Sequence, residues 1–188
     1  MEEKIKNYIK EILEFIGENP EREGLKSTPE RFIKMLKELT GGYKRDPDRI
    51  AEGAIFPAHT DQMIIVKDID FSSLCEHHLI PFFGKVHIGF IPDKKLIGLS
   101  KIPRIVNLFS KRLQVQERLT EEIANFIYKK IEPKGLGIVI EAIHLCTVIR
   151  GIKNKSAKLL TSKMMGVFKQ KEIKEDFFLL IKNMNEIK

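Results

Sequence analysis

Apolar residues recur at helical spacing near the N-terminus of this chain. Residues 2–16 carry isoleucine and leucine three or four positions apart, with Lys and Glu between them. This pattern predicts an amphipathic helix with a charged outer face. A second apolar stripe begins just after Pro29 and ends at Gly41-Gly42, which predicts another helix. We therefore expect residues 1–42 to form an N-terminal helical segment.

Four later segments have the pattern of β-strands. Residues 62–74 and 85–92 are apolar and partly β-branched, and so are residues 135–150 and 157–168. The strands therefore come as two consecutive pairs. Consecutive strands favour antiparallel hairpins over a wound parallel sheet, so the expected fold class is α+β.

Helices are expected between and after the two strand pairs. Ser100 is a candidate cap for a helix over residues 101–111, and a longer apolar stripe covers residues 114–131. A closing helix is expected over about 173–183, whereas residues 43–61 look irregular. Residues 43–188 are thus expected to form a single domain that follows the helical segment.

Composition narrows the class of protein. The chain has 188 residues, 33 Lys and Arg against 26 Asp and Glu, and a net charge of +7. That balance suits an anionic partner, whether nucleotide, nucleic acid or acidic lipid. The chain has neither a signal-peptide core nor an apolar run of about 18 residues, so we expect a cytoplasmic protein with no membrane partner. Its two cysteines cannot form a disulfide framework.

Two short strings carry the candidate chemistry. The string CEHH begins at Cys75, directly after a predicted strand, and the second cysteine is Cys146 in HLCTVIR. Cys75 and His78 are three residues apart, a spacing that allows both to bind one metal ion. With Cys146 they would make three protein ligands. Three ligands leave a fourth tetrahedral position for water, which is typical of a catalytic zinc site.

The strand predicted over 135–150 would place His144, Cys146 and Arg150 on one face, since side chains alternate along a strand. That face would carry an acid or base, a ligand and a cation that needs an anion when buried. A plainer interpretation remains open. Free cysteines are often small buried hydrophobes, and polar groups on a half-buried strand simply find partners.

Charged residues elsewhere also have two interpretations. Lys101, Arg104 and Lys111 are spaced to share one helix face, either as a solvated surface or as an anion site. Glu117 lies near a predicted helix start, where its charge interacts favourably with the helix dipole. Its carboxylate also suits a purine edge, because it accepts two parallel hydrogen bonds from a ring N–H and an amino group.

The strings CEHH, IGLSKIPRIV, QVQERLT and IHLCTVIRG, in this order, closely resemble the GTP cyclohydrolase I family. The segment GENPEREGLKSTPERFIKM resembles that family's N-terminal signature, and the likeness continues to LLTSKMMGVF. The resemblance implies the tunnelling fold (T-fold), an antiparallel sheet with flanking helices that assembles into a shared barrel. It also implies a homodecamer of two pentamers with active sites between subunits, the catalytic domain being residues 43–188.

The reaction that the resemblance implies converts GTP to 7,8-dihydroneopterin triphosphate with release of formate, an early step toward folate or tetrahydropterins. By matching positions, Cys75, His78 and Cys146 would bind zinc, which would activate water for attack on carbon 8 of guanine. His144 would protonate the adjacent ring nitrogen. His77 would move protons later, during ring opening and ribose rearrangement. Histidine suits both tasks because its ordinary pKa of about 6.5 lies near the working pH.

Substrate contacts follow from the same resemblance. Glu117, with Gln116 beside it, would hold the guanine edge. The triphosphate carries about four negative charges and would need a set of cations. The cations Lys101, Arg104 and Arg150 would bind it together with Ser100, and Arg31 and Lys34 would be added from a neighbouring subunit.

A few positions depart from the family's pattern. Ala157 and Leu159 stand near positions where Ser and Thr are common, and Ile149 replaces a usual methionine. Two alternatives to the cyclohydrolase remain. One is a related tunnelling-fold enzyme, such as a nitrile reductase, which would need a cysteine free of metal. The other is a structural zinc protein that binds nucleic acid through a basic surface, which would need a fourth ligand; we expect no nucleic-acid partner.

Overall fold

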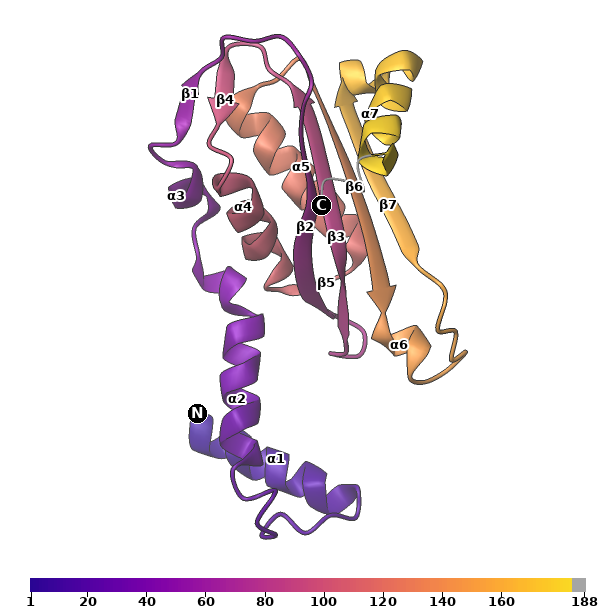
Figure 1. Cartoon of the computed structure of the whole chain (residues 1–188). Helices are drawn as coiled ribbons and strands as arrows, with labels where there is room; N and C mark the ends of the chain where they lie inside the picture. The colour runs from indigo at the N-terminus through magenta and orange to yellow at the C-terminus, as the bar shows by residue number, and fades with distance from the viewer. Residues whose placement is uncertain (184–188) are drawn as a thin grey trace. The chain divides into compact units, whose positions relative to one another are not determined.

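The chain was analysed as a computed structural model, which describes residues 1–183 (Figure 1). It divides into two compact units, Met1–Gly41 and Gly42–Lys188. The first unit consists of two helices, α1 (Glu2–Phe15) and α2 (Thr28–Leu39). Ile9 and Ile33 are their buried apolar residues, and Lys6 forms an ion pair with Glu30 at 3.1 Å. Both helices were predicted from the apolar spacing.

The second unit is built on a five-stranded sheet. Its strand order is β5-β2-β3-β6-β7. Strands β2, β3, β6 and β7 pair antiparallel in that order, whereas β5 adds to β2 through two parallel pairs. The α+β class predicted from the sequence is confirmed. The strand bounds are β2 Ile64–Cys75, β3 Pro81–Ile91, β5 Leu113–Gln114, β6 Gly135–His144 and β7 Leu159–Gly166.

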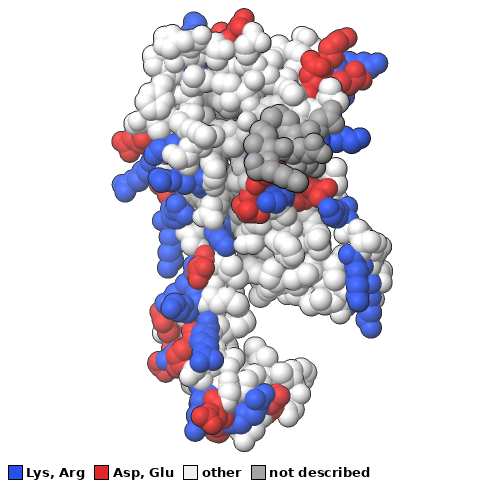
Figure 2. Space-filling view, in the orientation of Figure 1, with Lys and Arg blue, Asp and Glu red and all other residues white. Residues whose placement is uncertain are grey.

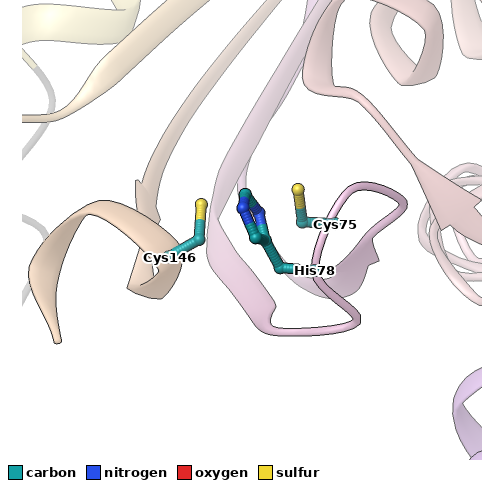
Figure 3. Close-up of side chains that lie close together, drawn as sticks. All are labelled: Cys75, His78 and Cys146. Carbon is teal, nitrogen blue, oxygen red and sulfur yellow. The ribbon is translucent and has the colours of Figure 1, made fainter. Parts of the chain in front are cut away.

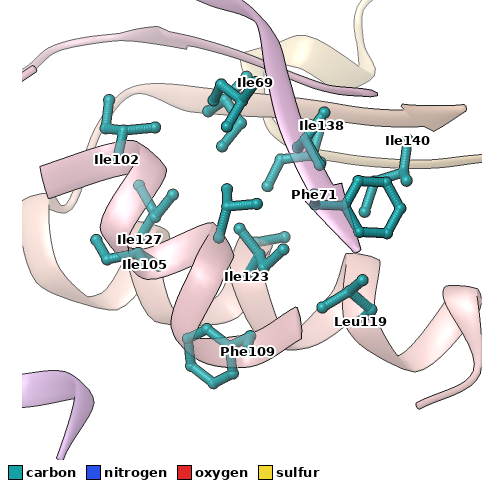
Figure 4. Close-up of a cluster of buried hydrophobic side chains, with 14 of the residues drawn as sticks. Ile69, Phe71, Ile102, Ile105, Phe109, Leu119, Ile123, Ile127, Ile138 and Ile140 are labelled. Carbon is teal, nitrogen blue, oxygen red and sulfur yellow. The ribbon is translucent and has the colours of Figure 1, made fainter. Parts of the chain in front are cut away.

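Helices cover both faces of this sheet. Helices α4 (Lys101–Ser110) and α5 (Gln116–Ile131) pack on one face, where apolar side chains from β2, β6 and both helices form the main core (Figure 4). On the other face, Val139 of β6 contacts the buried rings of Phe168 and Phe177. Phe168 belongs to the short 3₁₀ helix η2 (Val167–Lys169), and Phe177 belongs to helix α7 (Lys171–Asn183). The sheet is therefore a central layer, and its side-chain alternation divides the residues between two cores.

Residues 43–61 are more ordered than the sequence indicated. They contain the end of a short 3₁₀ helix, η1 (Gly41–Lys44), a short helix α3 (Pro47–Ala51) and strand β1 (Ile55–Pro57). Asp46 caps α3, because its Oδ1 accepts a hydrogen bond from the backbone N–H of Asp48 at 2.9 Å. Strand β1 pairs with β4 (Lys95–Ile97) in a separate two-stranded sheet. These elements are too short for hydrophobic periodicity to detect.

The strand predicted over 135–150 is too long at its C-terminal end. Strand β6 ends at His144, and the chain continues as the short helix α6 (Leu145–Val148). The reason lies in the neighbouring strand. His144 pairs with Phe82, and β3 begins only one residue earlier at Pro81, so β6 has no partner backbone beyond that point.

Within residues 1–183, no helix combines the length and the apolar character that crossing a membrane requires.

Close backbone approach between β3 and β6 yields a prediction for Gly84. A Cβ atom at Gly84 would lie 1.9 Å from the carbonyl oxygen of Glu141, a backbone atom that cannot move aside. We expect Gly84→Ala to lower the free energy of unfolding by at least about 1–3 kcal/mol, the usual cost of overpacking. Chemical denaturation at fixed protein concentration measures this change.

Gly98→Ala is the matched control, because a Cβ there meets only ordinary contacts at 3.7 Å or more. Equal stability of the two variants would contradict the register between β3 and β6.

Candidate active site

A tight turn after β2 positions the first candidate ligands. The backbone N–H of Cys75 donates to the Ile80 carbonyl at 3.0 Å, and the N–H of Leu79 donates back to the Cys75 carbonyl at 2.8 Å. Leu79 adopts a left-handed conformation with φ of 55°. This turn reverses the chain within five residues, so that His78 lies beside Cys75, the last residue of the strand.

Helix α6 supplies the third candidate ligand. His144 is the N-cap of α6, and the Thr147 hydroxyl donates to the His144 carbonyl at 2.9 Å. Cys146 therefore comes from a helical turn and not from the strand face that the sequence predicted. That face does not exist beyond His144, and Arg150 is exposed instead of half-buried on a strand.

The ligand atoms of Cys75, His78 and Cys146 all lie within 4.8 Å of one another (Figure 3). In a tetrahedral site with bonds of about 2.0–2.3 Å, donor atoms are separated by up to about 3.8 Å, so small side-chain shifts would complete it. Two thiols and one imidazole form a donor set that suits zinc. The residues present therefore fit the metal that the sequence indicated.

The Cys146 thiol has a raised pKa when no metal binds it. Burial raises the pKa of the Cys146 thiol, and the neighbouring Cys75 raises it further. Because a thiolate is the form that binds zinc, metal binding must release the proton of this thiol. His77, from the same turn, places its Nδ1 3.8 Å from the Cys75 Sγ and is exposed.

His144 is held in place on two sides. The Phe82 ring stacks on its imidazole with 4.5 Å between ring centroids and 6° between planes. Its Nε2 lies 2.9 Å from the Oε1 of Gln116. Burial lowers the pKa of His144, while the negative charge of Glu117 acts in the opposite direction.

The amide of Gln116 determines which nitrogen of His144 carries a proton. Gln116 is fully buried, and its Nε2 donates to the carbonyls of Ile140 and Leu159, each at 3.0 Å. Carbonyls only accept, so the amide cannot be flipped and its Oε1 must face His144. The His144 Nε2 is therefore the protonated nitrogen, which leaves Nδ1 free to exchange a proton.

The sequence predicts that Gln116, beside Glu117, holds the guanine edge, and the contacts of its side chain bear on that prediction. The side-chain amide is already committed to the backbone, to the Thr161 hydroxyl at 3.1 Å and to His144. Its partners are distant in sequence, so no local pattern indicated the contact. Glu117, the next residue, instead lines a hollow of about 260 Å³ with Thr120, Glu121, Thr161 and Ser162.

Comparisons with known proteins assign the chain to a family. The model of the GTP cyclohydrolase I family matches residues 5–182. This chain belongs to the GTP cyclohydrolase I family. A GTP cyclohydrolase 1 from Campylobacter lari is 48% identical over 189 residues and covers both chains completely. Another from Leptospira biflexa is 52% identical over 165 residues, 88% of this chain and 90% of that protein.

A third GTP cyclohydrolase 1, from Chlorobaculum tepidum, is 50% identical over 173 residues, 92% of this chain and 77% of that protein. A solved structure of the archaeosine synthase QueF-Like in the apo form covers 57% of this chain and 96% of its own. Its TM-score of 0.48 and identity of 11% are too low to bear on the assignment. Membership in the GTP cyclohydrolase I family confirms the enzyme class predicted from the sequence. It favours that prediction over the alternative of a structural zinc protein.

The predicted phosphate-binding residues of this chain fall in three places. Ser100 is the N-cap of α4, and Lys101 and Arg104 of its first turn line a hollow of about 540 Å³. Arg150 follows α6 and is exposed. Arg31 and Lys34 lie on α2, in the N-terminal unit. Lys111, at the end of α4, donates instead to the Ser72 hydroxyl at 3.2 Å.

Proposed function

We propose that this protein opens the imidazole ring of GTP at a zinc site, releases formate and forms 7,8-dihydroneopterin triphosphate. The observation that carries the proposal is the cluster of Cys75, His78 and Cys146. The three ligand atoms lie within 4.8 Å of one another, and two thiols and an imidazole would hold a zinc ion with one position left for water. Zinc, when bound, lowers the pKa of that water to about 7, so that it can serve as a nucleophile at neutral pH.

His144 donates a proton to the guanine nitrogen beside the attacked carbon. Its Nε2 is committed to Gln116, so the proton leaves from Nδ1. Protonation of the ring nitrogen withdraws electrons from the carbon and prepares it for attack. Burial, which lowers the pKa of His144, makes its protonated form a stronger acid. Stacking on Phe82 and the bond to Gln116 fix the direction in which that proton is offered.

The remaining side chains bind the substrate or move protons afterwards. The Glu117 carboxylate accepts hydrogen bonds from the guanine N–H groups in the hollow that it lines. His77, exposed beside Cys75, moves protons during ring opening and ribose rearrangement. Ser100, Lys101, Arg104 and Arg150 bind the triphosphate. Arg31 and Lys34 reach it from a neighbouring subunit of a decamer of two pentamers.

The proposed setting is the cytoplasm, where the product enters folate or tetrahydropterin synthesis. Ala157 and Leu159 are not among these assigned residues. Leu159 contributes only its backbone carbonyl to Gln116, which any residue would supply, and its side chain is 38% exposed. The departures from the family's usual Ser and Thr therefore change the surroundings of the site and not its proposed acids, ligands or cations.

The test of this function is incubation of reduced, zinc-loaded protein with GTP. We expect formate and a pterin that becomes fluorescent on oxidation to appear in equal amounts. Both should stop when a chelator removes zinc, and both should return when zinc is restored. Zinc bound at one ion per chain without formate release would contradict the proposal, and so would formate release that persists in metal-free protein.

Substitution of Gln116 tests its proposed positioning role toward His144. Gln116→Leu removes the acceptor at the His144 Nε2, and we expect kcat to fall by about 10–100-fold, the size of effect seen for residues that orient metal-binding histidines. The KM for GTP should change little, since the fully buried amide makes its hydrogen bonds within the protein. Steady-state kinetics measures both values.

Ser110→Ala is the control. The Ser110 hydroxyl is also buried, but it donates to the Val106 carbonyl at 2.7 Å and makes no hydrogen bond to His144 within residues 1–183. Its kcat should stay near that of the unmodified protein. Equal losses in the two variants would show a general packing effect and would contradict positioning by Gln116.

A further inference from the structure

A basic hollow lies at the start of α4 and extends beyond the residues already assigned to the triphosphate. Five cations line it, from three separate segments of the second unit. Lys101 and Arg104 belong to the first turn of α4. The other three have no role in the mechanism above: Lys44 ends η1, Arg45 follows it, and Arg49 lies on α3. Its volume of about 540 Å³ is within the usual range of small-molecule sites.

These cations are not neutralised by the protein. In the described part of the chain, none of the five has a carboxylate within 4.0 Å. The one carboxylate that lines the hollow, Asp46, is used as the N-cap of α3. By contrast, Lys130 of α5 is paired with Asp48 of α3 at 2.8 Å. Like charges gathered without partners repel one another, and a bound anion removes that repulsion.

The N-terminus of α4 adds to the positive potential. This helix has ten residues, no acidic residue in its first turn and no side-chain cap from Ser100. The positive end of its dipole is therefore not offset by a nearby carboxylate. Figure 2 shows Lys and Arg side chains gathered along the edge of the molecule where α3 lies in Figure 1. The hollow therefore combines volume, unpaired cations and a helix terminus.

We propose that Lys44, Arg45 and Arg49 bind the terminal phosphate of the substrate and make the enzyme prefer a triphosphate over a diphosphate. The inference rests on the proposed function, in which Lys101 and Arg104 hold the same phosphate chain. Arginine suits this task, because its guanidinium donates two parallel hydrogen bonds to phosphate oxygens. The three residues lie within 43–61, outside the strings that carry the family resemblance, so the resemblance does not assign them.

The test compares the zinc-loaded protein with its double variant Arg45→Gln/Arg49→Gln. We measure the Kd of inorganic tripolyphosphate by calorimetry, the KM for GTP and the inhibition constant of GDP. The Kd of tripolyphosphate and the KM for GTP should each rise about tenfold or more, the usual effect of losing a charge-assisted contact. The inhibition constant of GDP, which lacks the terminal phosphate, should change less than threefold.

The control variant is Lys94→Gln/Lys129→Gln, which removes the same two charges from exposed positions that line none of these hollows. Its Kd for tripolyphosphate, its KM for GTP and its inhibition constant for GDP should stay within about threefold of the values of the unmodified protein. The single variant Lys44→Gln gives a second test, with the same direction of change, if the double variant unfolds. Unchanged tripolyphosphate binding, or an equal loss in the control, would overturn the inference.

The two proposals fail in different ways. If the unmodified protein forms no formate from GTP, the proposed function fails, and the calorimetric comparison still decides whether this hollow binds a phosphate chain. If formate forms but the double variant keeps its preference for GTP over GDP, only the assignment of Lys44, Arg45 and Arg49 fails.

Discussion

The antiparallel register between β3 and β6 is the constraint on which the candidate site depends. Ten residue pairs, from Phe82 with His144 to Ile91 with Gly135, fix these strands against each other. Because side chains alternate, a slip of one residue would move His144 to the opposite face of the sheet. The same register brings the end of β6, and with it Cys146, to the turn that carries Cys75 and His78. Close contact at Gly84 leaves this pairing no room to shift.

Much of the fold could be predicted because its elements are long and amphipathic. Strand β2 and helices α4 and α5 each bury one side in the core, so hydrophobic spacing indicated them. The same reasoning failed where local pattern and tertiary contact disagree. The apolar residues after His144 look like a continuing strand, but the partner strand β3 ends there and the chain turns into α6.

Part of the candidate site could also be predicted from the sequence, for a similar reason. The ligand types and spacing of CEHH, and of the cysteine two residues after His144, are local signals that a motif can carry. The amide of Gln116 is different, because its partners belong to the ends of β6 and β7. The basic hollow likewise joins the segment around α3 to the start of α4, and no spacing rule relates those segments. Contacts between distant segments appear only once the fold is known.

We propose that the metal site has three protein ligands and one open position. Zinc K-edge X-ray absorption on the reduced, zinc-loaded protein measures its ligands. We expect two sulfur atoms at about 2.3 Å and two nitrogen or oxygen atoms at about 2.0–2.1 Å. We also expect an unchanged spectrum in His77→Ala, although the His77 Nδ1 lies 3.8 Å from the Cys75 Sγ. A histidine signal that His77→Ala removes would show a closed site with four protein ligands and would contradict the open position.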